Sequence, residues 1–254
     1  KNETEGIKYI KLAADKGHKD ALYNYFSIEL NKDNIKKEDL FQFLKKAAYK
    51  GHVDAMYRYG NKLFYLSKND QKNKKLSIAF LKKATDAGQL ESMVSYGMII
   101  NDGNGVPLDH VTSTRLFKIA AKNGNVEAMV EYGTNLYTGK GIEINKEAAP
   151  KYIKKAVNKG NLKAMIIYAY MLENGDGVPM NKEKAAKYYK IVADEDYASA
   201  MIKYANLIKE CNGIPANKEE AAKYYKMAAD KGDEDAMYYY SKMLYTGDGI
   251  PMNK

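Results

Sequence analysis

The apolar residues of the chain recur at helical spacing in segments of about a dozen residues. In residues 221–229 they follow the i, i+3, i+4, i+7, i+8 pattern of a helix with one buried face. Asn217 precedes this segment as a predicted N-cap, and Gly232 follows it, where a left-handed residue ends a helix at the least cost. A second helical segment runs from Ala236 to the break at Gly247. The pattern therefore predicts two helices joined by a short turn.

The same pair of helices recurs along the chain around the motif Ala-Ala-x-x-Gly-x-x-x-Ala. Clear copies begin at Ala13, Ala47, Ala120 and Ala228, and looser copies stand between them. The central glycine recurs at spacings of 34, 37, 36, 36, 36 and 36 residues, with Asp196 in place of one glycine. Such a register predicts an all-α array of about seven antiparallel helix-pair repeats, which bury a continuous core when they stack. The predicted single repeat domain, 1–254, has repeats at 2–34, 35–71, 72–108, 109–144, 145–180, 181–216 and 217–252.

One tyrosine stands at the same position in the second helix of every repeat, and the next residue is small in six of the seven. A large ring beside a small residue suits the close approach of neighbouring helices. We interpret these tyrosines as core residues with hydroxyls at a wet edge, in preference to an aromatic binding stripe. They are Tyr25, Tyr59, Tyr96, Tyr132, Tyr168, Tyr204 and Tyr240.

The segment from Ala221 to Pro251 resembles the Sel1-like repeats (SLR), a branch of the tetratricopeptide-like superfamily. It reads Ala-x-x-Tyr-Tyr-x-x-Ala-Ala-x-x-Gly-x-x-x-Ala-Met-x-x-Tyr, followed by Leu-Tyr-x-Gly-x-Gly-Ile-Pro, and it recurs in weaker form over essentially the whole chain. The resemblance implies a right-handed α-solenoid. It also implies a scaffold or adaptor role, because similar proteins hold complexes together in membrane-protein degradation, cell-wall synthesis control and bacterial host interaction. It does not identify the partner, since the family shares a shape and not a reaction.

Some segments depart from the repeat pattern. Asn31–Asn34 and Ser67–Asp70 lack the Gly-x-Gly loop that follows the later repeats. Pro150 removes a backbone donor early in a first helix, so we expect a late start or a bend there. Pro251–Lys254 matches Pro179–Lys182, which opens another repeat. We therefore expect the chain to be a piece of a longer array.

The residues that could carry chemistry are few. Cys211 is the one cysteine, and together with the absence of a signal segment it favours an intracellular protein. No apolar run is long enough to span a membrane. His18, His52 and His110 lack the spacing of a zinc site, and we expect the first two at the surface or capping a helix. The Gly-x-Gly loops follow helices and not strands, so they are predicted turns and not phosphate loops. We expect no enzyme activity, no cofactor and no metal.

The charge of the chain singles out one face of the first helices. The formal net charge is +9, and lysine stands six residues before the repeated glycine in all seven repeats. In tetratricopeptide-like solenoids the first helix lines the concave surface, so the resemblance places a basic ladder along a groove. The candidate partner-binding residues, here called the basic ladder, are Lys82, Arg115, Lys118, Lys151, Lys154, Lys187, Lys190, Lys223 and Lys226.

Three hypotheses explain the basic ladder. The first is that it binds an acidic segment of a partner protein. The second is a basic surface that binds nucleic acid or another polyanion non-specifically, although Arg58 and Arg115 are the only arginines and arginine is the usual base-reading cation. The third is a solvated face neutralised by i, i+4 ion pairs, each contributing only ~0.2–0.5 kcal/mol. The predicted pairs are Lys11–Asp15, Lys82–Asp86, Glu147–Lys151, Glu183–Lys187, Lys190–Asp194, Glu219–Lys223 and Lys226–Asp230.

Overall fold

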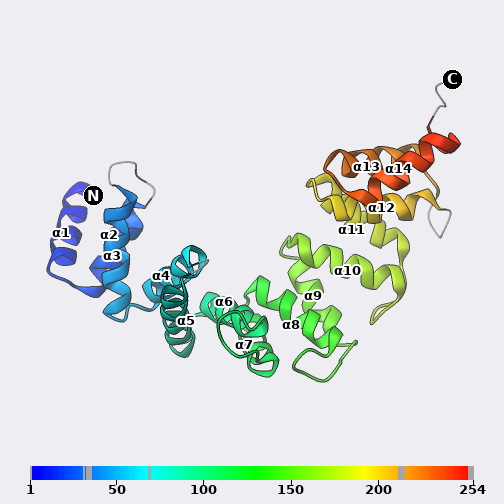
Figure 1. Ribbon diagram of the computed structural model, residues 1–254. Coiled ribbons are helices and arrows are strands. Elements are labelled where there is room, and N and C mark those ends of the chain that lie inside the picture. The colour runs from blue at the N-terminus through cyan, green and yellow to red at the C-terminus, as the bar shows by residue number, and fades with distance from the viewer. Residues whose placement is uncertain (1, 31, 33–35, 68–69, 211–214, 251–254) are drawn as a thin grey trace. The chain divides into compact units, whose positions relative to one another are not determined.

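The computed structural model describes residues 2–30, 32, 36–67, 70–210 and 215–250. The residues in these ranges form fourteen α-helices and no strand (Figure 1), which confirms the predicted all-α array of helix pairs. The first helix of each pair, the A helix, is α1 (Glu3–Asp15), α3 (Lys37–Tyr49), α5 (Gln71–Asp86), α7 (His110–Lys122), α9 (Ala149–Val157), α11 (Lys182–Asp194) or α13 (Lys218–Asp230). The second, the B helix, is α2 (Lys19–Glu29), α4 (Val53–Leu66), α6 (Leu90–Asn101), α8 (Val126–Thr138), α10 (Leu162–Asn174), α12 (Ala198–Lys209) or α14 (Glu234–Thr246).

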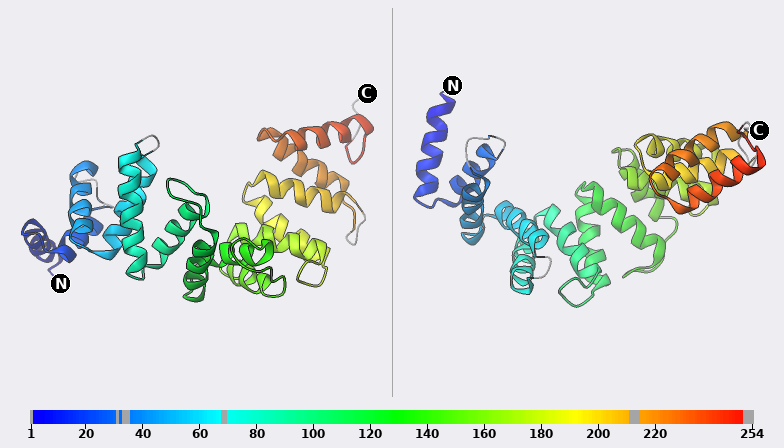
Figure 2. Two further views of the ribbon diagram at one scale, coloured as in Figure 1. Left: turned by 60° about the horizontal axis from the view of Figure 1, so that its bottom comes forward. Right: turned by 45° about the horizontal axis from the view of Figure 1, so that its top comes forward.

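The helices belong to two compact units. Unit 1 is Lys1–Asn125 and holds α1 to α7, and unit 2 is Val126–Lys254 and holds α8 to α14. Within each unit, every helix packs against the helices that precede and follow it in the chain, as Figure 2 shows from two further sides. Such nearest-neighbour packing is typical of repeat proteins, in which each repeat contacts only its neighbours.

The helix ends follow the predicted turn chemistry. Asn217 caps α13, where its Oδ1 accepts a hydrogen bond from the backbone N–H of Glu220 at 3.0 Å. The repeated glycines that end the A helices all have positive φ, and Asp196, which replaces one of them, has a φ of 72°. Pro150 lies in the first turn of α9, which begins at Ala149 and has only nine residues. The expected late start is therefore confirmed.

The tyrosine repeated in the B helices packs against the A helix that follows it. Five of the seven tyrosines are buried, and Tyr96 and Tyr240 are half-buried. The five buried rings meet an aromatic ring of the next A helix edge to face, at interplanar angles from 62° to 86°. This geometry contributes about 0.5–1.5 kcal/mol per pair beyond the burial of area. The pairs are Tyr25–Phe43, Tyr59–Phe80, Tyr132–Tyr152, Tyr168–Tyr188 and Tyr204–Tyr224.

The small residue after the tyrosine allows this close packing. A Cβ atom added at Gly133 would lie 2.6 Å from the Cδ1 atom of Ile153 on α9. In unit 1, a Cβ atom at Gly97 would lie 2.7 Å from the ring of Phe117 on α7. A side chain at these positions would therefore push the A helix away, which explains why the sequence keeps them small.

The last B helix differs from the others in burial. Met237, Leu244 and Tyr245, which the sequence places on one apolar face of α14, are 47%, 45% and 89% exposed. No helix in the described part of the chain covers this face. The predictions for Cys211 and for Pro251–Lys254 fall outside the described residues.

Candidate partner-binding surface

All nine residues of the basic ladder lie on A helices. Lys82 on α5 and the pair Arg115 and Lys118 on α7 belong to unit 1, and the other six belong to α9, α11 and α13 of unit 2. Eight of the nine side chains are exposed, and Lys190 is half-buried. The A-helix surface of unit 2, meaning the exposed faces of α9, α11 and α13, therefore holds most of the ladder.

Part of the ladder is neutralised within the protein. Three of the seven predicted helical ion pairs form: Lys82–Asp86 at 2.9 Å, Glu183–Lys187 at 2.6 Å and Lys226–Asp230 at 2.8 Å. These pairs are exposed, so each contributes little to stability. The predicted pair Lys190–Asp194 is wrong, because Lys190 binds Glu220 on the next A helix. The pairs Lys11–Asp15, Glu147–Lys151 and Glu219–Lys223 also do not form in this structure.

Four ladder lysines keep an uncompensated charge. Lys118, Lys151, Lys154 and Lys223 are exposed and make no ion pair with any residue in the described ranges. Arg115 lies in the field of Asp109, whose pKa is lowered mainly by its hydrogen bonds from Thr112 and in small part by this guanidinium. The ladder lysines of unit 2 therefore fall into two groups. Lys151, Lys154 and Lys223 are unpaired, whereas Lys187, Lys190 and Lys226 form ion pairs.

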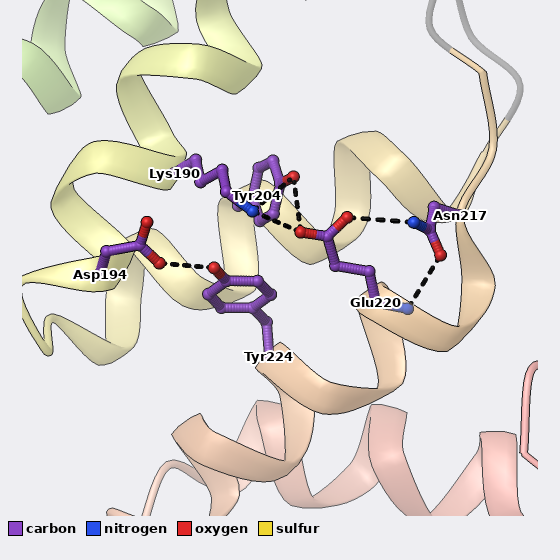
Figure 3. A network of polar contacts seen from close by, with 6 residues as sticks. All are labelled: Lys190, Asp194, Tyr204, Asn217, Glu220 and Tyr224. Atoms are coloured by element: carbon purple, nitrogen blue, oxygen red, sulfur yellow. Dashed lines mark hydrogen bonds and ion pairs between the residues drawn. The ribbon is translucent and has the colours of Figure 1, made fainter.

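Lys190 is held by a network that joins α11 to α13 (Figure 3). Its Nζ donates to Oε1 of Glu220, and the Tyr204 hydroxyl donates to the same oxygen at 3.1 Å. Asn217 Nδ2 donates to Oε2 of Glu220 at 3.0 Å, and the Tyr224 hydroxyl donates to Asp194 at 2.5 Å. The hydrogen bond to Glu220 raises the pKa of Lys190 above its usual range. Lys190 is thus positively charged, and its partner is the Glu220 carboxylate of the same chain.

Sequence reasoning missed Glu220, because the rule for ion pairs on one helix reaches only three or four residues. The contacts that join successive A helices link residues about 30 positions apart, as Lys190 and Glu220 show. A search for opposite charges at that spacing is the signal that could have found this pair.

A groove of about 530 Å³ lies beside this network. Its lining includes Lys187 and Lys190, but also the carboxylates of Glu183, Glu219 and Glu220. Cations and anions are therefore mixed in the groove. Among the ladder residues of unit 2, those without an ion pair are Lys151, Lys154 and Lys223, and all three lie outside this lining.

The remaining candidates for chemistry have structural roles. His18 and His52 cap B helices by accepting a hydrogen bond from a backbone N–H through Nδ1, each at 3.3 Å, which confirms the capping prediction. In the Gly-x-Gly loop after α10, Asp176 forms an ion pair with Lys146 at 3.0 Å and accepts a hydrogen bond from the Tyr137 hydroxyl. That bond and Lys146 lower the pKa of Asp176. Across the described ranges, no group of three or more His, Cys, Asp or Glu could hold a metal ion.

The repeats match a known family over most of the chain. The family model for the Sel1 repeat matches residues 1–18, 41–52, 53–89, 90–125, 126–161, 162–197, 198–233 and 234–254. The chain belongs to the Sel1 repeat family. From residue 53 onward each family repeat begins at the first residue of a B helix, half a repeat after the start of the helix pairs defined above. No curated protein sequence matches the chain.

Two solved structures share this Sel1 repeat fold. A protective antigen of uropathogenic Escherichia coli strains, which displays an SLR fold, has a TM-score of 0.84 and 20% identity; the match covers 97% of this chain and 53% of that chain. A Sel1 repeat protein from Oxalobacter formigenes has a TM-score of 0.74 and 22% identity, with coverage of 99% and 73%. The chain thus spans about half the length of the first protein and about three quarters of the second. At this identity the likeness establishes the helical-repeat fold.

Sel1 repeat proteins are generally protein-interaction scaffolds, and a helical solenoid of this kind is typically non-catalytic. Among the helices of the described ranges, none is long and apolar enough to cross a membrane.

Proposed function

We propose that this Sel1 repeat protein is a scaffold that binds an acidic segment of a partner protein on the A-helix surface of unit 2. The observation that carries the proposal is the set of exposed lysines without an intramolecular anion. Lys151 and Lys154 lie on α9 and Lys223 lies on α13. The same face uses its other ladder lysines in ion pairs, so it has both fixed and free cations.

The spacing of these lysines suits an extended segment and not a single small anion. Lys154 and Lys223 lie on A helices two repeats apart, with α11 between them in the chain order. A segment with several Asp or Glu residues meets both helices and releases counterions at each. Because these contacts are exposed, they contribute mainly to the rate of association and to specificity, and the binding weakens as salt rises.

Non-specific binding of nucleic acid or another polyanion is the alternative, and the formal net charge of +9 favours it. The two functions differ in what they recognise. A polyanion surface responds to total charge wherever the lysines lie, whereas a protein-binding surface responds to the charges on α9, α11 and α13 alone.

The double substitution Lys154→Glu with Lys223→Glu tests the proposal. Binding is measured by fluorescence anisotropy with a labelled peptide of alternating Glu and Ser, at low and at near-physiological salt. The control Lys159→Glu with Lys203→Glu makes the same change in charge at exposed lysines outside the A helices that also lack an ion pair. We expect the first variant to weaken binding at least about tenfold more than the control, because it replaces two attractions with two repulsions.

The polyanion alternative would be favoured by two results together: an equal loss of peptide binding in both variants, and binding of a labelled DNA duplex as tight as that of the peptide. Absence of peptide binding to the unsubstituted chain at low salt would contradict the proposed function.

A further inference from the structure

The network around Glu220 has a counterpart one repeat earlier in the same unit. Each of its six residues corresponds to the residue 36 positions before it. Lysine, both tyrosines and the asparagine are identical in the two sets, and the two acids alone differ. Lys190, Asp194, Tyr204, Asn217, Glu220 and Tyr224 correspond to Lys154, Asn158, Tyr168, Asn181, Lys184 and Tyr188.

The tyrosine pair and the asparagine cap are arranged in the same way in both repeats. The rings of Tyr168 and Tyr188 meet edge to face at 5.7 Å and 76°, as those of Tyr204 and Tyr224 do at 4.9 Å and 85°. Asn181 caps α11 by accepting a hydrogen bond from the backbone N–H of Lys184 at 2.8 Å, in the way that Asn217 caps α13. The helix positions and the aromatic pair are therefore equivalent, and the carboxylate is what the earlier site lacks.

The donors that bind Glu220 in one repeat have no acceptor in the other. The side-chain donors of Lys154, Asn181 and Lys184 and the hydroxyl of Tyr168 make no hydrogen bond or ion pair with any residue of the described ranges. The charged groups of the Glu220 network sum to −1, from Lys190, Asp194 and Glu220. Those of the counterpart sum to +2, from Lys154 and Lys184. The earlier site therefore has donors on four side chains that lack an acceptor within the described ranges, and its charged groups sum to a net positive charge.

We propose that these residues of α9, α10 and α11 form a carboxylate-binding site, filled by an Asp or Glu side chain of the partner segment. The Glu220 carboxylate is the template for the ligand: one oxygen accepts from lysine and tyrosine, and the other accepts from asparagine. A planar group with two oxygens fits this division of donors. The proposal rests on the proposed function and names the residues that give it specificity.

Lys184→Glu is the direct test, because it places a carboxylate from the protein itself at the position equivalent to Glu220. We expect this variant to pair Lys154 internally and to weaken binding of the Glu–Ser peptide, with an amidated C-terminus, by about tenfold or more. Lys203→Glu on α12 is the matched control and should weaken binding much less. The thermal midpoint of Lys184→Glu should equal or exceed that of the unsubstituted chain, since the substitution adds an ion pair at an exposed position.

The reciprocal substitution tests whether a second carboxylate-binding site can be created in the next repeat. Asp194→Asn with Glu220→Lys gives the later site the composition of the earlier one. In a titration with a peptide that carries a single Glu, we therefore expect each chain of this variant to bind two peptide molecules instead of one. A circular dichroism melt verifies that the variant folds.

The outcomes separate this inference from the proposed function. Equal loss of binding in Lys184→Glu and Lys203→Glu would overturn the carboxylate site and leave the scaffold proposal in place. Absence of any peptide binding to the unsubstituted chain would overturn both.

Discussion

Tyr132→Ala is expected to lower the free energy of unfolding by ~3–5 kcal/mol, the range for aromatic truncations in protein cores. Tyr132 is 4% exposed, and its ring meets Tyr152 of the next A helix edge to face at 4.8 Å. The neighbouring Gly133 already brings Ile153 close, so the helices cannot move much closer to fill the space left by the ring. Urea denaturation followed by circular dichroism measures the change.

Two variants control for this effect. Tyr132→Phe should change stability little, because the Tyr132 hydroxyl makes no hydrogen bond with a residue in the described ranges. Tyr245→Ala should also change it little, since that side chain is 89% exposed. A Tyr132→Ala chain as stable as the Tyr245→Ala chain would show that the repeated tyrosine is not a core residue.

Gly177→Ala is expected to destabilise the protein by about 2–5 kcal/mol, the sum of backbone strain and overpacking. Gly177 has a φ of +75°, and a Cβ atom there would overlap the carbonyl oxygen of Lys146. Two contacts hold the segment that carries this oxygen. One is the hydrogen bond from the Asn145 N–H to the Leu136 carbonyl at 2.7 Å, and the other is the ion pair between the Lys146 and Asp176 side chains. The loop therefore has little room to yield.

Gly160→Ala separates strain from overlap. Gly160 has a φ of +80°, but a Cβ atom there would meet nothing within 4 Å. We expect it to cost only the ~1–2 kcal/mol of a left-handed alanine. Equal stabilities of the two variants in the same denaturation assay would contradict the close contact at Gly177.

The fold of this protein could be predicted from its sequence because the same residue pattern recurs in every repeat. The repeated glycine needs a positive φ, and even Asp196 adopts one. The tyrosine and the small residue after it predict a close helix contact, which Gly133 and Ile153 form. The exposure of the apolar face of α14 does not follow from the pattern, because the burial of a face depends on whether another helix packs against it.

The candidate site was only partly predictable. The position of the ladder on the A helices follows from the register, but the state of each charge does not. Lys190 pairs with Glu220 across two helices, whereas Lys154, at the same place in its repeat, makes no pair. The difference lies in one residue of the following A helix, Glu220 or Lys184. A local rule for helical ion pairs cannot detect it.

Zero-length carbodiimide cross-linking of the amidated Glu–Ser peptide to the full chain tests the central claim most directly, because it joins a peptide carboxylate only to a lysine that it touches. Mass spectrometry then identifies the lysine. We predict cross-links at Lys151, Lys154 and Lys223 on A helices. Cross-links concentrated at Lys163 and Lys203 on the B helices α10 and α12 would contradict it.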